Sequence, residues 1–272
     1  MQDMAETLQL LVLVRHGKTA RDELREAWKR GENPTLPPGQ TGEDLLDDSI
    51  KQMWQSGRWI AQHILRRFGL QQFDGYFTSL SQRSIESAAA MDFTDVVWQG
   101  DERLNERDRG EMRKLLPKGY ASKYPESIEA MQRDPLHWVP VGGEAVLPHV
   151  MDKTKSILRE IGYGDTRLRS SLVVGHRDQI WSFAMPLERL SEDEFLAVDT
   201  ESMGNGHVIC YSSYKPQSNG PEYSPSSGAF IPGPDTVAPA LLWKLSVDPQ
   251  DPAASAGWQI LPHVAEHYGW HE

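Results

Sequence analysis

A short apolar run near the N-terminus, residues 8–14 (LQLLVLV), constrains the fold more than any other feature of the chain. A run of strand length without regular polar alternation is typical of a strand that is buried on both faces. Such strands belong to parallel-rich sheets that are covered by helices on both sides. The run therefore predicts the central strand of a layered α/β fold, and 272 residues are enough for one domain of this kind.

The rest of the chain alternates between strand-like and helix-like patterns. Further strands are expected at 73–78, 96–99, 171–174, 207–213 and 240–247, and helices at 46–68, 82–91, 144–161 and 178–185. Pro148 should fall in the first turn of its helix, and Pro186 should end the helix before it. Residues 20–44 are polar and contain three prolines, so they should form a long loop with at most one helical turn. The alternation predicts a single domain over 1–272, a three-layer α/β/α sandwich with a mostly parallel central sheet.

Charge and composition exclude several classes of function. The formal net charge is -11, so the chain should bind neither nucleic acid nor an anionic membrane, and it must concentrate positive charge locally to handle an anionic substrate. The single cysteine, Cys210, excludes an internal disulfide, and its apolar neighbours indicate a buried thiol. No apolar run is long enough to cross a bilayer, and the first ten residues lack Lys and Arg. We expect a cytoplasmic protein.

Chemically useful side chains follow two of the predicted strands directly. Arg15, His16 and Gly17 come after the first strand, and His176 comes after the strand at 171–174. Ligands of open α/β sheets bind at such strand ends. The arginine offers a planar fork of donors to phosphate, a neutral histidine can attack phosphorus, and the glycine lets the backbone approach an anion. By itself the tripeptide is equally compatible with an ordinary turn.

Five elements, taken in order, resemble the histidine phosphatase, or phosphoglycerate-mutase-like, superfamily. They are Arg15-His16-Gly17, SLSQRSIESA at 79–88, LNERDRG at 104–110, Gly143-Glu144, and Val173-Val174-Gly175-His176. The resemblance covers about residues 8–212. It implies a phosphoglycerate-mutase-like fold and a metal-independent phosphomonoester hydrolase, without a cofactor, that acts on a phosphorylated small molecule.

The resemblance also implies a role for each matched side chain. His16 resembles the nucleophile that becomes phosphohistidine, and His176 the histidine that stabilises the transferring group. Arg15 and Arg83 resemble the arginines that clamp phosphate, and Glu106 takes the position of the proton donor. The chemistry agrees, because a phosphoryl group in transfer needs positive donors on several sides and its leaving oxygen needs a proton. The alternative for Glu106 is a solvated acid, since its neighbourhood is dense in charge.

The sequence departs from the family pattern near both histidines. Lys18 and Asp22 stand where the family has Glu or Gln and Asn, and Arg177 follows the second histidine in place of glycine. We expect Gly17, Lys18, Asp22 and Arg177 to join the phosphate-binding set. Asp22 would repel phosphate unless it is paired or protonated, so either Lys18 offsets it or the loop is displaced. The usual Leu-Thr-x-x-Gly is also missing, with residues 46–50 in its place.

Three further segments are assigned less specifically. Residues 107–140 are predicted to be a lid whose basic and aromatic side chains hold a second phosphate or a ring, or else form a solvated surface; residues 20–44 are the other candidate wall. Residues 214–239, rich in Pro, Gly and Ser, are predicted to be a mobile loop. His263, His267 and His271 recur every four residues, but Gly269 weakens a helix there, and we expect no metal site.

Hydrolysis competes with two other hypotheses. A mutase of the phosphoglycerate-mutase type would return the phosphoryl group to another hydroxyl, although the modest stretch between Glu106 and His176 favours hydrolysis. A non-catalytic phosphate-binding module is disfavoured because all the core groups are present. We expect activity to prefer mildly acidic pH, since Glu106 should be protonated and His176 cationic while His16 stays neutral.

Overall fold

The computed structural model describes residues 8–32, 34–35, 42–113, 115, 117–163, 168–198, 203–213, 241–255 and 257–263. Within these residues the strands form one sheet in the order β3-β2-β4-β1-β5-β6-β7. The strands are β1 Leu10–Arg15, β2 Gly75–Ser79, β3 Trp98–Asp101, β4 Ser170–Gly175, β5 Val208–Ser212, β6 Trp243–Val247 and β7 Gln259–Ile260. The helices are α1 Ala20–Lys29, α2 Asp47–Ile60, α3 Gln82–Ala90, α4 Pro117–Lys123, α5 Pro125–Arg133, α6 Met151–Tyr163, α7 Arg177–Glu188 and α8 Glu192–Ala197. Five shorter helical turns are η1 Ala61–Leu65, η2 Glu102–Leu104, η3 Gly110–Arg113, η4 Val146–Val150 and η5 Pro252–Ala254.

The central strand β1 is buried on both faces, as its apolar run predicts. Leu10, Val12 and Val14 pack into one hydrophobic cluster, whereas Leu11 and Leu13 pack into another on the opposite face. Side chains alternate across a strand, so a strand in the middle of three layers must be apolar at every position. The three-layer α/β/α architecture is thereby confirmed.

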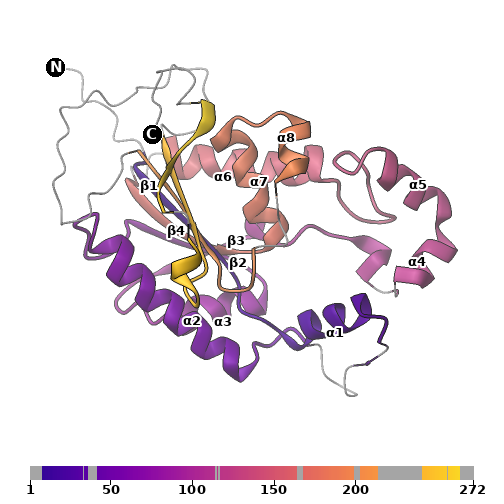
Figure 1. Cartoon of the computed structure of the whole chain (residues 1–272), viewed down its shortest axis with the longest axis horizontal. Coiled ribbons are helices and arrows are strands. Elements are labelled where there is room, and N and C mark those ends of the chain that lie inside the picture. The colour runs from indigo at the N-terminus through magenta and orange to yellow at the C-terminus, as the bar shows by residue number, and fades with distance from the viewer. Residues whose placement is uncertain are drawn as a thin grey trace.

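Helices cover both faces of this sheet. In Figure 1, α2 and α3 lie on one side of the strands, and α6, α7 and α8 lie on the other. The first cluster includes Met53 and Ile60 of α2, and the second includes Ile157 of α6 and Phe183 of α7. α2, α6 and α7 therefore bury apolar stripes against the sheet, whereas Phe195 of α8 packs into a third cluster with Leu136 and Met151.

Parallel pairing gathers strand ends at one edge of the sheet. β1 runs parallel to β4, β4 to β2, and β2 to β3, while β5, β6 and β7 continue the sheet in antiparallel pairs. Consequently the carboxyl ends of β1, β2, β3 and β4 all meet at the same edge. The residues that follow these ends are close in space although they are far apart in the sequence.

The segment after β1 differs from the expected loop, because α1 is a regular helix of ten residues. Thr19 caps it: the Thr19 side chain accepts a hydrogen bond from the Asp22 amide, and the Asp22 carboxylate accepts one from the Thr19 amide. This reciprocal pair satisfies amides that a helix start would otherwise leave without partners. The prolines at 34, 37 and 38 come after the helix and do not interrupt it.

Both predicted proline effects are wrong in detail. The helix expected from residue 144 begins as α6 only at Met151, since Leu147 has extended backbone (φ −109°, ψ 130°). A residue before proline is disfavoured in helical geometry, so Pro148 delays this helix. Pro186 lies inside α7, which continues to Glu188 and ends where Arg189 adopts a left-handed conformation. So close to the end of a helix, the missing proline amide removes only one hydrogen bond.

Residues 107–140 project beyond the end of the sheet as η3, α4 and α5, beside α1 (Figure 1). Two backbone hydrogen bonds close their base: Glu111 N donates to Val141 O (2.9 Å) and Glu144 N donates to Asp108 O (2.8 Å). Gly110 has φ +51°, and a Cβ there would lie 2.1 Å from Val141 O. The two ends of the segment therefore meet at a neck that requires glycine at this position.

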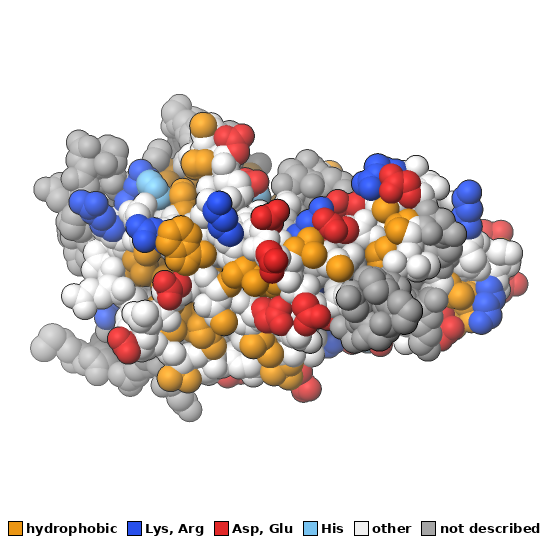
Figure 2. Space-filling view, turned by 90° about the horizontal axis from the view of Figure 1, so that it is seen from below, with side chains coloured by type: hydrophobic (Ala, Val, Ile, Leu, Met, Phe, Trp, Pro, Cys, Tyr) orange, Lys and Arg blue, Asp and Glu red, His pale blue; other side chains and the backbone are white. Residues whose placement is uncertain are grey.

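The surface on the α2 side shows scattered apolar side chains between charged ones (Figure 2). Ile50 and Trp54 of α2 are among the exposed large hydrophobic residues. Within the described residues, no helix is long and apolar enough to cross a membrane. The predicted loop at 214–239 lies outside the described residues.

Candidate active site

Four side chains converge at the sheet edge where the parallel strands end. His16 follows β1, His176 follows β4, Arg83 lies in the first turn of α3 after β2, and Glu106 follows β3 and η2. The Arg83 guanidinium joins them: its Nε donates to His16 Nε2 (3.3 Å) and its Nη2 donates to Glu106 Oε2 (2.7 Å) and His176 Nδ1 (3.2 Å). We call these four residues the inner cluster. They come from four separate sequence motifs, and the fold brings them together.

His16 is held in the form that can attack phosphorus. Its Nδ1 lies 2.7 Å from the Gly17 carbonyl oxygen, which can only accept, so Nδ1 carries the proton and Nε2 keeps its lone pair. The ring is buried (5% exposed). Burial lowers the pKa of His16 to about 4, aided by the positive charges of Arg83 and Arg15 and opposed by Asp22. The residue is therefore neutral at physiological pH, with its free nitrogen facing the guanidinium.

His176 lies beside His16, with the two ring centroids 5.0 Å apart. Its Nδ1 accepts from Arg83, so the other nitrogen, Nε2, donates towards the hydroxyl of Ser79 (2.9 Å) or Ser81 (3.1 Å). Burial, together with His16 and Arg83, lowers the pKa of His176 well below its usual value. A second positive charge buried next to an arginine is costly, so this environment disfavours the cationic His176 that is expected to bind a phosphate dianion.

Glu106 is surrounded by arginines. Besides Arg83, its carboxylate meets Arg25 of α1 at 3.6 Å and Arg113 of η3 at 3.4 Å. Burial works against its charged form, but Arg25 and Arg83 outweigh burial and hold the pKa of Glu106 well below its usual range. These arginines favour the charged form of Glu106, whereas the expected role as a general acid requires a proton on this carboxyl group.

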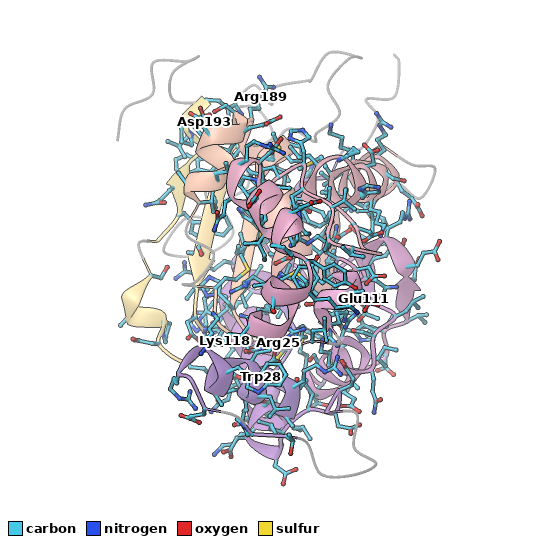
Figure 3. All side chains as sticks on the ribbon, turned by 90° about the vertical axis from the view of Figure 1, so that its right-hand side faces the viewer. Arg25, Trp28, Glu111, Lys118, Arg189 and Asp193 are labelled. Atoms are coloured by element: carbon cyan, nitrogen blue, oxygen red, sulfur yellow. The ribbon has the colours of Figure 1, made fainter. Side chains whose placement is uncertain are left out.

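Arg25 and Arg113, together with Arg21 of α1, form the outer rim of the site. Figure 3 looks at the end of the molecule where α1, which carries the labelled Arg25 and Trp28, lies next to residues 107–140, which carry the labelled Glu111 and Lys118. Arg25 and Arg113 are 38% and 32% exposed, against 7% for Arg83. We call Arg21, Arg25 and Arg113 the outer arginines.

One hydrogen-bond donor of the Arg15 guanidinium group has no partner among the described residues. Its Nη1 donates to Met203 O (2.5 Å), but its buried Nε has no hydrogen-bond partner among the described residues. Burial lowers the pKa of Arg15, and Asp22 partly opposes this. A buried guanidinium N–H without a partner is costly, and hydrogen bonds of arginine to an anion are among the strong ones.

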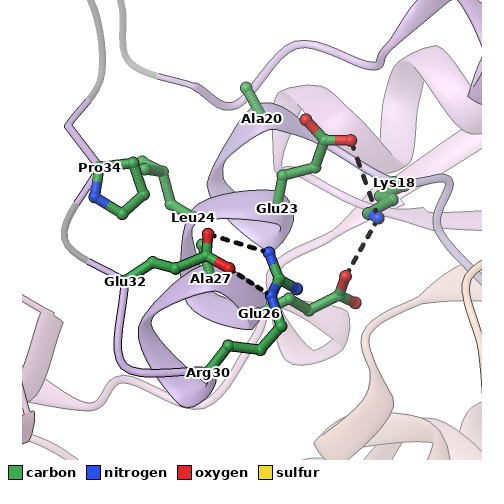
Figure 4. Close-up of a pocket in the computed structure, with 9 residues that line it drawn as sticks. All are labelled: Lys18, Ala20, Glu23, Leu24, Glu26, Ala27, Arg30, Glu32 and Pro34. Carbon is green, nitrogen blue, oxygen red and sulfur yellow. Dashed lines mark hydrogen bonds and ion pairs between the residues drawn. The ribbon is translucent and has the colours of Figure 1, made fainter.

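The accessory residues after His16 are tied to the fold. The Gly17 amide donates to Ser87 Oγ (2.9 Å), and a Cβ at Gly17 would lie 3.0 Å from Met53 Cγ. The Asp22 carboxylate accepts from the Thr19 amide and hydroxyl at the start of α1. Lys18 Nζ lies 3.1 Å from Glu26 and 3.8 Å from Glu23, in a groove of about 480 Å³ along α1 (Figure 4). These polar groups thus have partners within the chain.

Asp178, the second residue of α7, holds three arginines near the site. Its carboxylate lies 2.6 Å from Arg109 Nη2, 3.4 Å from Arg107 Nε and 4.0 Å from Arg177 Nε. The positive charge of Arg177 also contributes to the lowered pKa of Arg15. This concentration of guanidinium groups supplies locally the positive charge that a chain of net charge -11 lacks overall.

Sequence reasoning missed the polar residues that support the inner cluster. Ser79 Oγ donates to Asn105 Oδ1 (2.9 Å) and so accepts from His176, while Glu43 accepts from Arg83 Nη1. Ser79 and Asn105 stand inside quoted motifs, next to a strand end and to Glu106, and that adjacency is the signal that could have identified them. No motif marks Glu43.

The described residues contain no group of three His, Cys, Asp or Glu side chains placed to hold a metal ion. His263 has its Nδ1 3.1 Å from the Glu188 carbonyl oxygen. His267 and His271 lie outside the described residues. Cys210 is buried in β5, and burial raises the pKa of its thiol.

Comparisons with known sequences and with solved structures identify proteins that this chain resembles. Residues 11–219 match the model of the histidine phosphatase superfamily (branch 1). The 2,3-bisphosphoglycerate-dependent phosphoglycerate mutase of Azorhizobium caulinodans is 27% identical over 207 residues, covering 75% of this chain and 91% of the relative. A putative alpha-ribazole-5'-P phosphatase of Escherichia coli has a TM-score of 0.57 at 17% identity, over 76% of this chain and 91% of that one. A mycobacterial glucosyl-3-phosphoglycerate phosphatase has a TM-score of 0.55 at 21% identity, over 76% and 91%. At these identities the two structures support the fold alone.

Proposed function

Because the chain belongs to the histidine phosphatase superfamily (branch 1), we propose that it is a phosphomonoester hydrolase that works through a phosphohistidine on His16. The observation that carries the proposal is the orientation of His16: its unprotonated Nε2 faces Arg83, within the buried inner cluster that also contains His176 and Glu106. A phosphoryl group in line with Nε2 would meet Arg83 directly and the unpartnered Nε of Arg15 nearby.

The reaction then has two balanced steps. In the first, the His16 Nε2 lone pair forms a bond to phosphorus, the bond to the ester oxygen breaks, and a proton from Glu106 neutralises the leaving alkoxide. In the second, Glu106 takes a proton from water, the water oxygen bonds to phosphorus, and the P–N bond breaks to release phosphate and restore His16. The arginines balance the charge on the equatorial oxygens in both steps, so the chemistry needs no metal.

The lowered pKa of Glu106 requires a source for the proton that it donates. A phosphomonoester has its second pKa near ~6 and can bind as the monoanion. Once the phosphoryl oxygens occupy the arginines that stabilise ionised Glu106, the carboxylate loses that stabilisation and becomes the better base. The substrate can therefore carry in the proton, which passes through Glu106 to the leaving group.

Trapping the phosphoenzyme tests the proposal. The protein should hydrolyse an activated aryl phosphate at the same rate with and without a chelator. Enzyme quenched during turnover of a labelled phosphomonoester should carry label that is stable in alkali, labile in acid, and absent from His16→Asn. Label on another residue, or turnover without a trapped intermediate in either protein, would show that the mechanism is wrong.

The names of the sequence relatives support a second candidate, a mutase that passes the phosphoryl group of phosphohistidine to another hydroxyl. The two reactions share the first step and differ in the acceptor. Turnover of a labelled phosphomonoester in the presence of excess hydroxy acid acceptor distinguishes them, because a hydrolase releases stoichiometric inorganic phosphate and a mutase transfers label to the acceptor.

A further inference from the structure

A second carboxylate, besides Glu106, binds the guanidinium of Arg83. We call this guanidinium the clamp, because the proposed function has it bind phosphate. Arg83 Nη1 donates to Glu43 Oε2, on the opposite side of the guanidinium from the Nη2 that binds Glu106. With Nε directed at His16, every nitrogen of Arg83 is engaged within the chain. The mechanism proposed above uses Glu106 and His16 but gives Glu43 no role.

The backbone holds Glu43 in this position from both sides. The Arg21 amide donates to Gly42 O (3.1 Å), and the Leu45 amide donates to Glu86 Oε2 (2.8 Å). Gly42 has φ +69°, a left-handed turn that directs the chain towards α3. Glu43 is therefore fixed between the start of α1 and the first turns of α3, and it is only 23% exposed.

Glu43 also has a second partner that lies outside the clamp. Arg21 Nη1 lies 3.1 Å from Glu43 Oε1, while the other oxygen, Oε2, accepts from Arg83. The carboxylate thus bridges an outer arginine and the clamp. If a phosphate takes Arg83 Nη1, Glu43 can remain paired through Arg21, so displacement does not leave it without a cation.

Resting on the function proposed above, we propose that Glu43 sets the affinity of the site for phosphate, because its carboxylate competes with phosphate for Arg83. Any phosphate that binds the clamp must displace a carboxylate and then lie near its negative charge. A substrate offsets this cost through contacts made by the rest of the molecule, whereas free orthophosphate has no such contacts. Glu43 therefore weakens the hold of Arg83 on substrate and product by a similar factor, and free phosphate, which lacks other contacts, remains the weaker ligand and is released.

The test is titration of the purified protein with orthophosphate by calorimetry. Glu43→Gln should bind phosphate about tenfold more tightly than the wild type, because a charged hydrogen bond to the clamp no longer competes. The matched control is Glu32→Gln, which removes the same charge from a carboxylate that pairs with Arg30 in the α1 groove (Figure 4), and its phosphate affinity should not change. In steady-state assays the phosphate inhibition constant of Glu43→Gln should fall by the same factor of about ten.

Each outcome decides the proposal. Unchanged or weaker phosphate binding by Glu43→Gln, or equal tightening by Glu32→Gln, overturns the role of Glu43. Phosphoenzyme trapping in the wild type separates that result from a failure of the phosphatase function, since trapping does not depend on Glu43. Thermal unfolding checks that each variant is folded. Should Glu43→Gln not fold, Glu43→Asp, whose shorter side chain withdraws from Arg83, should tighten binding in the same direction, and no tightening there overturns the role too.

Discussion

The inner cluster and the outer arginines meet at Glu106 and Glu43 but are positioned by different means. His16, Arg83 and His176 are buried, follow the ends of parallel strands, and are fixed by hydrogen bonds to one another. Arg25 and Arg113 come from α1 and from residues 107–140, are about one third exposed, and meet the site through Glu106. The difference teaches that the sheet fixes the reacting groups, while the segments between strands supply charges that can change without disturbing it.

The strongest test of this contrast is His16→Ala. We expect kcat/KM to fall by at least about 10⁴-fold, because the covalent step has no other nucleophile. Cooperative unfolding should persist, since the ring contributes to chemistry rather than to either hydrophobic cluster. Steady-state kinetics and calorimetric unfolding check both statements, with the exposed His137→Ala as control. Residual activity within tenfold of the wild type would remove His16 from the mechanism.

Glu106→Gln should separate substrates by their leaving groups. A general acid contributes about 10²- to 10⁴-fold where the leaving alkoxide is strongly basic, so alkyl phosphates should lose that much in kcat. Activated aryl phosphates need little protonation and should lose far less. Comparing kcat for an alkyl and a nitrophenyl phosphate measures the difference. Equal losses on both would mean that Glu106 binds the substrate but donates no proton.

Outside the pH optimum, kcat/KM should change by about tenfold per pH unit. The lowered pKa of His16 keeps it neutral above about 4, so kcat/KM should fall on the acid side only as the pH drops towards that value. On the alkaline side the reactive substrate is the monoanion, so the limb should follow the substrate's second pKa near ~6. Substrates of different second pKa should shift the alkaline limb alone. An alkaline limb that stays fixed across substrates would indicate an enzyme group instead.

Arg113→Ala should have a smaller effect. An arginine that is about one third exposed contributes less than a buried one, so we expect KM to rise about three- to tenfold with kcat within twofold. Lys118→Ala, on α4 of the same segment (Figure 3), is the control and should change neither constant. A loss in kcat comparable to that of Glu106→Gln would place Arg113 with the inner cluster and break the distinction.

Thr19→Ala should affect stability and barely affect activity. Removing the cap of α1 should lower the free energy of unfolding by about 1 kcal/mol, with kcat/KM within about twofold. Ser191→Ala, at the equivalent capping box of α8, is the matched control away from the site and should show the same loss of stability. A tenfold loss of activity in Thr19→Ala alone would show that the start of α1 helps to bind the substrate.

The sequence reveals the inner cluster because its members directly follow or closely neighbour strand ends that are recognisable by their apolar runs. The 15–17 and 173–176 motifs locate the two histidines in this way. The sequence analysis predicted a loop at 20–44, where α1 lies, because three prolines follow in that segment. The spacing of Thr19 and Asp22, which is that of a capping box, was the signal for this helix. Sequence reasoning also missed the contact between Glu43 and Arg83, since residues separated by 40 positions meet only through the packing of α2 and α3.

The neck of residues 107–140 has a consequence for how such a molecule can diverge. The two backbone hydrogen bonds at the base hold the ends of the segment together next to η2 and η4. Closing a loop between these two ends costs conformational entropy. That entropy grows only with the logarithm of loop length, so each doubling adds about 0.6 kcal/mol. A longer, shorter or wholly rewritten segment can therefore be grafted onto Gly110 and Gly143 while the strands keep their register. Because of the neck, the length and sequence of this segment can change at little cost in the free energy of unfolding.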